Sequence, residues 1–341
     1  MQIVGPEKVL ITGGHEVGGV ASFAEGLAQG FVALGIPSEI IPPSGILSHW
    51  HDLRDPKVLK ILSTTAVYAA PFVRRAICMA HGIPRMNRRG GLRMLGILAT
   101  WKLANVCSGT QLVSVSMYTA VHLEALFNLR SDGIILNPVK PVFLEAPEEP
   151  EQERRYITFA GRLDPCKNLH RLLPAVRDLL DGNSGLRVCI VGEGSEKAAL
   201  MNAVEGDSRF EFRGYVDDLE LRMWLRRTKV FVSGNETEGL GIAYLEALSQ
   251  GCVVVMPASG GGLEVALEEI GNSVHLFPLS FDRTEVLSVL RRSLASHCDP
   301  IPMTAYSAAE VAKAYLRVDA RFSLSGKFVE YKAELADRGL A

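Results

Sequence analysis

Short apolar runs alternate along the first half of this chain with longer segments in which apolar residues recur every three or four positions. The short runs predict strands, and the periodic segments predict helices between them. The expected strands cover 8–14, 39–41, 76–80, 112–115 and 133–136, and the expected helices cover 20–34, 58–70, 92–104 and 118–127. This alternation predicts a parallel sheet with helices on both faces.

From Phe143 the sequence becomes acidic and proline-bearing without an apolar period, which predicts a domain boundary. The alternation then restarts. Strands are expected at 156–160, 186–191, 210–212, 230–233 and 274–277, and helices from Lys167-Asn168, at 242–248, at 284–294, at 308–318 and at 325–335, the last two separated by Phe322-Ser323. We therefore expect an α/β protein with Rossmann-like domains at 1–145 and 146–318, followed by a terminal helical segment at 319–341.

The composition is that of an ordinary globular protein. Of the 341 residues 48% are hydrophobic and 22% are charged, which excludes wholesale disorder, and the net charge of -2 makes no case for a nucleic-acid partner. Six cysteines without C-x-x-C spacing predict a reduced, cytoplasmic protein. No stretch approaches the ~20 apolar residues of a membrane span, and the first residues lack the pattern of a signal peptide.

The stretch 232–264 carries the main chemical signal. Glu238 precedes Gly239-Leu240-Gly241, and a helix-forming run from Ile242 contains Glu246. The first amides of a helix have no partner within it and attract anions. The eight positions between the glutamates are a little over two helical turns, so both lie on a similar side. Two carboxylates beside an anion-binding turn suit a ligand with phosphates and hydroxyls, such as a nucleotide sugar.

Two cations flank another turn between a strand and a helix. Arg162 and Lys167 are five positions apart, so both can reach one point at the edge of the sheet and clamp a diphosphate. Two unrelated surface cations are the alternative interpretation. Asp217-Asp218 at a helix start is expected to cap that helix rather than to bind a metal.

Loops that follow the strands of the first half share one edge of the predicted sheet. One is the glycine-rich turn with Gly18 and Gly19, which is either a ligand-binding turn or a tight connection. Another holds His81, which either faces a ligand or caps its strand by bonding to nearby backbone. In the second half, the turn with Gly192 and Gly194 is a weaker candidate for ligand binding.

The stretch 57–102 contains nine lysines and arginines and no acidic residue, with an apolar segment at 91–98 and Trp101 nearby. A basic surface that exposes apolar groups suits an anionic membrane face. A solvated basic face over a core helix, or a surface that steers a phosphorylated acceptor, are alternatives. The stretch has no motif for reading nucleic acid.

Together these motifs resemble the donor site of the retaining GT-B glycosyltransferases of family four, the glycosyl transferases group 1. The matching patterns are G-R-x-x-x-x-K-N-L after a strand, E-G-x-G with the second glutamate at the eighth position, G-x-x-V-V and G-G-x-x-E. The resemblance covers nearly the whole chain. It implies two Rossmann-like domains with parallel sheets facing a cleft, and a C-terminal helix that crosses back to the N-terminal domain.

The resemblance also implies roles for individual residues. Arg162 and Lys167 hold the diphosphate, Glu238 binds sugar hydroxyls, and Glu246 binds the ribose. His81 lies against the donor sugar. Further donor-binding candidates are Gly18, Gly19, Gly192, Gly194, Gly214, Tyr215, Val216, Gly239, Leu240, Gly241 and Ile242. No metal or other cofactor is expected. Leu136-Asn137-Pro138 departs from the Pro-Asn-Gly that is frequent in the family.

The expected activity is transfer of a sugar from a UDP- or GDP-linked donor to a hydroxyl of a glycan or lipid-linked acceptor, with retention of configuration. The protein is expected in the cytoplasm or peripherally on the inner face of the membrane. A nucleotide-sugar-binding scaffold without catalysis and a sugar-nucleotide epimerase are the competing hypotheses.

Overall fold

The computed structural model describes residues 5–13, 19–73, 75–83, 91–106, 110–145, 153–267 and 272–324. The chain divides into two compact units: unit 1 comprises Met1–Pro138 with Ala305–Ala341, and unit 2 comprises Val139–Thr304. Along the sequence, the boundaries between the units lie between residues 138 and 139 and between residues 304 and 305. The sequence analysis predicted these boundaries at 145/146 and 318/319. The first boundary comes earlier because Phe143 is buried in unit 2, where its carbonyl oxygen accepts a hydrogen bond from Gln250 Nε2 at 2.9 Å.

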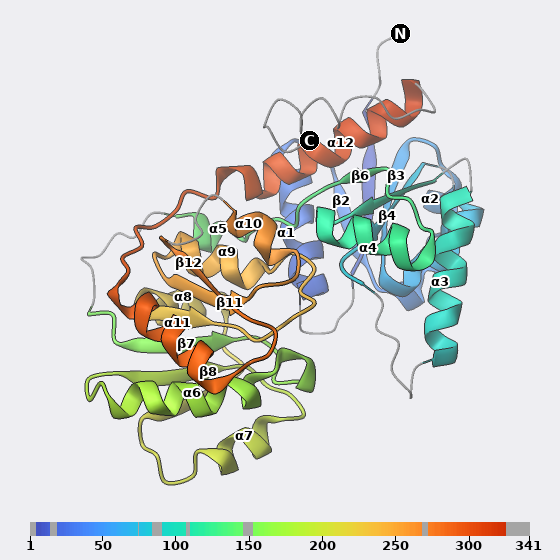
Figure 1. Ribbon diagram of the computed structural model, residues 1–341. Coiled ribbons are helices and arrows are strands. Elements are labelled where there is room, and N and C mark those ends of the chain that lie inside the picture. Colours follow the sequence, from blue (N-terminus) through green and yellow to red (C-terminus); the bar gives the residue numbers. More distant parts are fainter. Residues whose placement is uncertain are drawn as a thin grey trace. The chain divides into compact units, whose positions relative to one another are not determined.

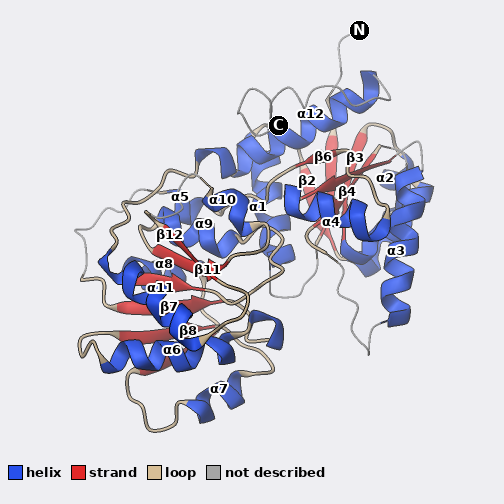
Figure 2. Cartoon of the chain, viewed as in Figure 1, coloured by secondary structure: helices blue, strands red, loops and turns tan. Residues whose placement is uncertain are grey.

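Unit 1 is built on a six-stranded parallel sheet in the order β2-β1-β3-β4-β5-β6. Its strands are apolar along most of their length because helices cover both faces (Figure 2). The strands are β1 (Lys8–Thr12), β2 (Ser38–Ile41), β3 (Val58–Ser63), β4 (Ala76–Ala80), β5 (Thr110–Ser114) and β6 (Gly133–Ile134). The helices are α1 (Gly19–Ala33), η1 (Pro43–His49), α2 (Trp50–Arg54), η2 (Thr64–Phe72), α3 (Gly91–Val106), α4 (Met117–Phe127) and α12 (Ala308–Leu324).

Two predictions of helices in unit 1 were wrong. The segment 58–70 was predicted as one helix but forms β3 followed by η2, because a short apolar run fits a buried strand as well as a helix. Lys60 in this strand is fully buried, and its Nζ donates to the carbonyl oxygen of Asp55 at 2.5 Å. Helix α12 continues through the predicted break at 322–323 to Leu324, and the predicted helix 325–335 lies outside the described residues.

Helix α12 packs along α1 within unit 1 (Figure 1). The two backbones are so close that a Cβ atom on Gly30 would lie 2.0 Å from the carbonyl oxygen of Ala308. Near the other end of α12, Asp319 accepts two hydrogen bonds from Arg75, at 2.8 Å from Nε and 2.6 Å from Nη2. Both side chains are largely buried, so this bidentate pair fastens α12 to the start of β4.

Unit 2 repeats the architecture with a parallel sheet in the order β12-β11-β10-β7-β8-β9. The strands are β7 (Tyr156–Ala160), β8 (Arg187–Val191), β9 (Phe210–Gly214), β10 (Thr228–Val232), β11 (Val253–Pro257) and β12 (Val274–Phe277). The helices are α5 (Pro141–Leu144), η3 (Pro165–Lys167), α6 (Leu169–Asp181), α7 (Lys197–Ala203), α8 (Asp218–Arg226), α9 (Ile242–Ser249), α10 (Gly262–Ala266) and α11 (Arg283–Ala295), and η4 (Thr304–Tyr306) spans the 304/305 boundary.

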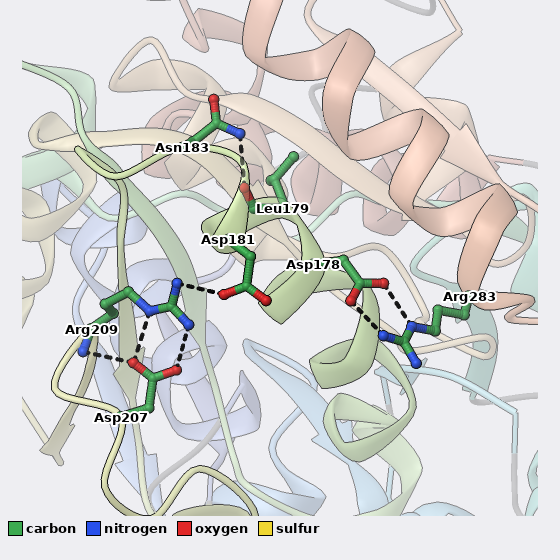
Figure 3. A network of polar contacts seen from close by, with 7 residues as sticks. All are labelled: Asp178, Leu179, Asp181, Asn183, Asp207, Arg209 and Arg283. Atoms are coloured by element: carbon green, nitrogen blue, oxygen red, sulfur yellow. Dashed lines mark hydrogen bonds and ion pairs between the residues drawn. The ribbon is translucent and has the colours of Figure 1, made fainter.

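Polar contacts fix the C-terminal end of α6 (Figure 3). Asp181 accepts from Arg209 Nη1 at 2.8 Å, just before β9. Asp178 accepts from Nε of Arg283, the first residue of α11, at 2.6 Å. The Asn183 amide closes the helix by donating to the carbonyl oxygen of Leu179 at 2.8 Å. Helix α6 is thereby tied to two neighbours, and its other end presents the turn that carries Lys167.

Candidate functional site

The structure brings together two residues that the sequence selected, Lys167 and Glu238. Lys167 is the last residue of η3, and its Nζ donates to Glu238 Oε2 at 2.7 Å. Asn235 Nδ2 donates to the same oxygen at 2.5 Å. The two side chains of the ion pair remain 22% and 25% exposed, so a ligand can still reach them. This group of three residues, the Lys167–Asn235–Glu238 cluster, lies between the β7–α6 turn and the turn that precedes α9.

A second layer of contacts holds these two turns against each other. Asn168 has a left-handed backbone (φ 50°), and its amide donates to the carbonyl oxygen of Gly234 at 3.0 Å. Arg171 Nη1 pairs with Glu236 Oε1 at 2.9 Å, and its guanidinium lies 3.8 Å from the centre of the Phe281 ring. Sequence reasoning missed Asn235, Arg171 and Glu236 because their partners are brought close only by the fold. Asn168 lies within the K-N-L motif, so the sequence did indicate that this residue belongs near the site.

The turn into α9 depends on glycines at close contacts. Gly241 caps the helix with a φ of 84°, and a Cβ atom there would lie 2.3 Å from the Tyr244 ring. A Cβ atom on Gly262 would lie 2.5 Å from the same ring, whose hydroxyl is 3.0 Å from Ser233 Oγ. The predicted helix at 242–248 is confirmed as α9, so its first amides open beside this turn.

The backbone of Glu238 is held from a third side. Its carbonyl oxygen accepts a hydrogen bond from the Gly261 amide at 2.8 Å, in the loop after β11. Among the predicted donor-binding residues of this turn, Leu240 is only 2% exposed. Its side chain packs inside the unit, so Leu240 can meet a ligand only through its main chain.

Arg162 is placed differently from Lys167. Its side chain is 64% exposed, and Nη2 lies 3.4 Å from Asp164 Oδ2. The structure therefore pairs this guanidinium weakly with Asp164 and not with the carboxylate of Glu238. A weakly held, solvated guanidinium on the same turn as Lys167 remains accessible to an anionic ligand.

Glu246 lies on α9 and is partly buried. Burial raises the pKa of its carboxyl to about 8, nearby Asp218 adds to the rise, and Lys140 opposes it. The side chain is therefore mostly neutral at pH 7, which the sequence did not indicate. A neutral carboxyl donates one hydrogen bond and accepts others, whereas a carboxylate only accepts.

The glycines of the neighbouring loops have packing roles. Gly192 has a φ of 130°, and a Cβ atom there would lie 1.9 Å from the carbonyl oxygen of Gly161. Gly194 is packed in the same way against Leu163, and Gly214 has a φ of 67°. After Gly214, the side chain of Tyr215 is 66% exposed and Val216 is partly buried. These glycines let three loops meet at one edge of the sheet, where the exposed Tyr215 is open to a ligand.

In unit 1, His81 follows β4 and makes an edge contact with Phe23, with ring centroids 4.5 Å apart. Its Nε2 is buried without a hydrogen-bond partner among the described residues. Burial lowers the pKa of His81 to about 4, which the Asn137 side chain partly opposes, so the ring is neutral at pH 7. Gly19 opens α1 with free space where a Cβ would lie, and Gly18 lies outside the described residues.

Of the cations in 57–102 whose side chains are described, Lys57 and Lys102 are exposed, whereas Lys60 and Arg75 are buried or largely buried. Lys57 pairs with Glu7 at 2.8 Å, Lys60 is buried, and Arg75 is bound to Asp319. Trp101 is 5% exposed and belongs to the core, whereas Lys102 is exposed. The side chains of the remaining cations in this stretch lie outside the described residues. No helix in the described parts of the chain is both long and apolar enough to span a bilayer.

Asp217 has the capping role that the sequence predicted. It is the N-cap of α8, and its carboxylate accepts from the amide of Glu220 at 2.8 Å, with Asp218 in the first turn. The five described cysteines form no disulfide bonds with one another: Cys78, Cys166, Cys189, Cys252 and Cys298.

Comparison with known proteins points to one family. Residues 143–278 match the family model of the glycosyl transferases group 1. The chain is 32% identical over 173 residues to the D-inositol 3-phosphate glycosyltransferase of Streptomyces coelicolor, a match that covers 46% of this chain and 36% of that relative. The matched region thus spans about a third of the relative's length.

Solved structures resemble nearly the whole chain. WaaG, a glycosyltransferase involved in lipopolysaccharide biosynthesis, aligns with a TM-score of 0.65 at 14% identity, covering 97% of this chain and 99% of WaaG. HepE from Anabaena, in complex with UDP and glucose, aligns with a TM-score of 0.61 at 16% identity, covering 93% of this chain and 95% of HepE. At such identities the likeness shows the fold. The chain therefore has the GT-B fold, and its segment 143–278 is similar to the glycosyl transferases of group 1.

Proposed function

We propose that this protein is a retaining glycosyltransferase that moves a sugar from a nucleoside diphosphate sugar, UDP- or GDP-linked, to a hydroxyl group of an acceptor. The observation that carries the proposal is the Lys167–Asn235–Glu238 cluster at the entrance to α9. The cluster combines the ammonium of Lys167 with the carboxylate of Glu238, a group that can bind sugar hydroxyls, and it lies beside the N-terminus of α9. All of these residues fall within 143–278, the segment that matches the family model.

The leaving group sets the main chemical demand. When the bond between the anomeric carbon and the diphosphate breaks, negative charge develops on the phosphate oxygens. Lys167, Arg162 and the first amides of α9 are assigned to stabilise that charge. Glu238 is assigned to the sugar hydroxyls and Glu246 to the ribose. Lys167 can contact Glu238 and a phosphate together because an ammonium has three donors.

The proposed step balances without a further reactant. The acceptor oxygen forms its bond to the anomeric carbon on the face from which the diphosphate departs, and the departing phosphate oxygen takes the acceptor proton. The protein supplies the countercharge, so we expect neither a metal nor another cofactor. His81, neutral at pH 7, is assigned to a hydrogen bond with the donor sugar rather than to proton transfer.

The names of the similar proteins support the choice of ligands. HepE is described in complex with UDP and glucose, which supports a UDP-linked donor. WaaG acts in lipopolysaccharide biosynthesis, which supports a lipid-linked or other cell-envelope glycan as the acceptor. We place the protein in the cytoplasm, where donors of this kind are used, with peripheral contact to the inner face of the membrane. Lys57 and Lys102 are exposed cations of the described residues that support this contact.

A donor screen tests the function. The protein is incubated with UDP- and GDP-linked sugars, with and without a lipid-linked glycan fraction, and released nucleotide is measured. We expect release of one diphosphate that increases with acceptor. Binding without release would favour the scaffold hypothesis, and an isomerised sugar nucleotide formed without acceptor would favour the epimerase hypothesis.

A further inference from the structure

The loops that follow β8 and β9 hold a carboxylate and an ammonium side by side at one edge of the sheet in unit 2. Glu193 lies in the loop after β8, and Lys197 is the first residue of α7. Lys197 Nζ donates to Glu193 Oε1 at 2.6 Å. A Cβ atom on Gly214, the last residue of β9, would lie 2.8 Å from this oxygen and 3.7 Å from Lys197 Nζ. The Glu193–Lys197 pair is therefore packed against the backbone at the end of β9.

This pair differs from the common ion pair on the surface of a helix. Glu193 precedes α7, and its carboxylate contacts the backbone of a different strand. Its second oxygen, Oε2, has no hydrogen-bond partner among the described residues, and Lys197 has one described acceptor for its three donors. The side chains of Glu193 and Lys197 are 55% and 30% exposed. One oxygen and one ammonium donor can therefore both meet a ligand.

Backbone hydrogen bonds connect the pair to the β7–α6 turn of the candidate site. The amide of Leu163 donates to the carbonyl oxygen of Glu193 at 2.8 Å, and the amide of Gly192 donates to the carbonyl oxygen of Gly214 at 2.6 Å. The loops after β10, β7, β8 and β9 follow one another along the edge in the order of the strands. The proposed function assigns the sugar to the turn after β10 and the diphosphate to the turn after β7. The nucleoside then extends towards the loops after β8 and β9.

The groups at this end of the edge suit a purine base with two neighbouring donors. Tyr215 follows Gly214 directly, and its 66% exposed side chain offers an aromatic surface to a base. The Watson–Crick edge of guanine presents a 2-amino group and N1–H as donors, with O6 beside them as an acceptor. A carboxylate accepts from both donors, one on each oxygen, and an adjacent ammonium donates to O6. Uracil has one N–H between two carbonyl oxygens, so one carboxylate oxygen would face a carbonyl oxygen.

We propose that Glu193 and Lys197 select guanine, which makes the donor a GDP-linked sugar. Glu193 accepts from the 2-amino group and N1–H of the base, and Lys197 donates to O6. This inference rests on the proposed function, which leaves the donor UDP- or GDP-linked. It also gives the glycine at position 214 a role in recognition, because a side chain there would displace the carboxylate of Glu193.

Titration calorimetry on the whole protein compares GDP with inosine diphosphate (IDP), which lacks only the 2-amino group, and with UDP. The three ligands share the ribose and the diphosphate, so differences in affinity report contacts with the base. We expect GDP to bind about tenfold more tightly than IDP, because the hydrogen bond that IDP loses is made to a charged but partly exposed group. UDP should bind more weakly than GDP.

The same titrations distinguish failure of this inference from failure of the proposed function. Equal affinities for GDP and IDP, or tighter binding of UDP than of GDP, would overturn the selection of guanine and leave the glycosyltransferase function standing. If the protein binds no nucleoside diphosphate, the proposed function itself fails, and this inference fails with it.

Variants separate recognition of the base from a merely structural role. Glu193→Ala should reduce the ratio of GDP to IDP affinity to about one, whereas Glu205→Ala, at an exposed position of the same unit, should leave the ratio unchanged. Lys197→Met should weaken GDP and IDP together and keep their ratio, because both bases carry O6. Equal weakening of GDP, IDP and UDP by Glu193→Ala would show a structural role and refute the inference. Loss of the ratio in Lys197→Met would refute the assignment of its ammonium to O6.

Discussion

Replacing Glu246 by glutamine should make unit 2 more stable near neutral pH. The folded state raises the pKa of this carboxyl from its ordinary value of 4.5 to about 8, so the folded protein keeps it neutral while the unfolded chain ionises it. A group of this kind stabilises the folded state fully only below its unfolded pKa. That stability is lost as the pH rises towards the folded pKa.

The size of the effect follows from the pKa values. Each unit of pH between 4.5 and 8 costs about 1.4 kcal/mol, so at pH 7 the glutamate lowers the free energy of unfolding by roughly 3 kcal/mol relative to pH 4.5. Glutamine has a similar shape and does not ionise. We expect Glu246→Gln to have little effect near pH 4.5 and to stabilise the protein by about 3 kcal/mol at pH 7, with the gain growing until pH 8.

Urea unfolding at pH 5, 6, 7 and 8 measures this gain. Glu205→Gln is the matched control because it makes the same charge change at an exposed position of unit 2. We expect a pH-dependent gain for Glu246→Gln and none for the control. If the two variants show the same pH dependence, or if Glu246→Gln destabilises the protein at pH 7, then burial does not hold Glu246 neutral and the reasoning is wrong.

Three further predictions concern the donor site, a loop contact and the membrane. Arg162→Ala should slow turnover about a hundredfold in steady-state kinetics while Glu246→Ala mainly weakens donor binding, and the reverse order would contradict the assigned roles. Gly192→Ala should lower the free energy of unfolding by roughly 3 kcal/mol, because its backbone is left-handed and its Cβ would meet the Gly161 carbonyl, whereas Gly185→Ala in open space should change it by less than about 1 kcal/mol. Vesicles with anionic lipid should retain the protein at low salt and release it at high salt, and equal retention by neutral vesicles would exclude a charged membrane surface.

The alternation of strands and helices could be predicted from the sequence because each element carries its own period. Segment 58–70 shows where this fails. Val58 to Leu62 is a run of apolar residues interrupted by Lys60. Considered without the rest of the fold, this lysine favours a helix that has Lys60 on its exposed side. The fold instead buries Lys60 in β3, where its long side chain reaches the carbonyl oxygen of Asp55. The carbonyl oxygen of Asp55 belongs to the turn before β3. It comes within reach of Lys60 only when β3 has joined the sheet.

The candidate site could be predicted in its motifs but not in its contacts. The sequence pointed to Lys167 and Glu238 separately, and only the fold showed that they form an ion pair. The ion pair of Arg171 with Glu236 and the influence of Asp218 on Glu246 join residues that are far apart in the chain. No spacing rule links such pairs. Their positions follow from the packing of α6 and α8 in unit 2.

The attachment of α12 to unit 1 by Arg75 and Asp319 bears on how the protein is synthesised. Unit 2 is continuous in the sequence, so all of it is synthesised before Asp319 is made. Unit 1 is the first unit to begin in the sequence and the last to be completed. Its helix α12 is encoded more than 200 residues after strands β1 to β4. A nascent chain halted after residue 304 would therefore contain all of unit 2, together with a part of unit 1 in which the surface of α1 is still uncovered.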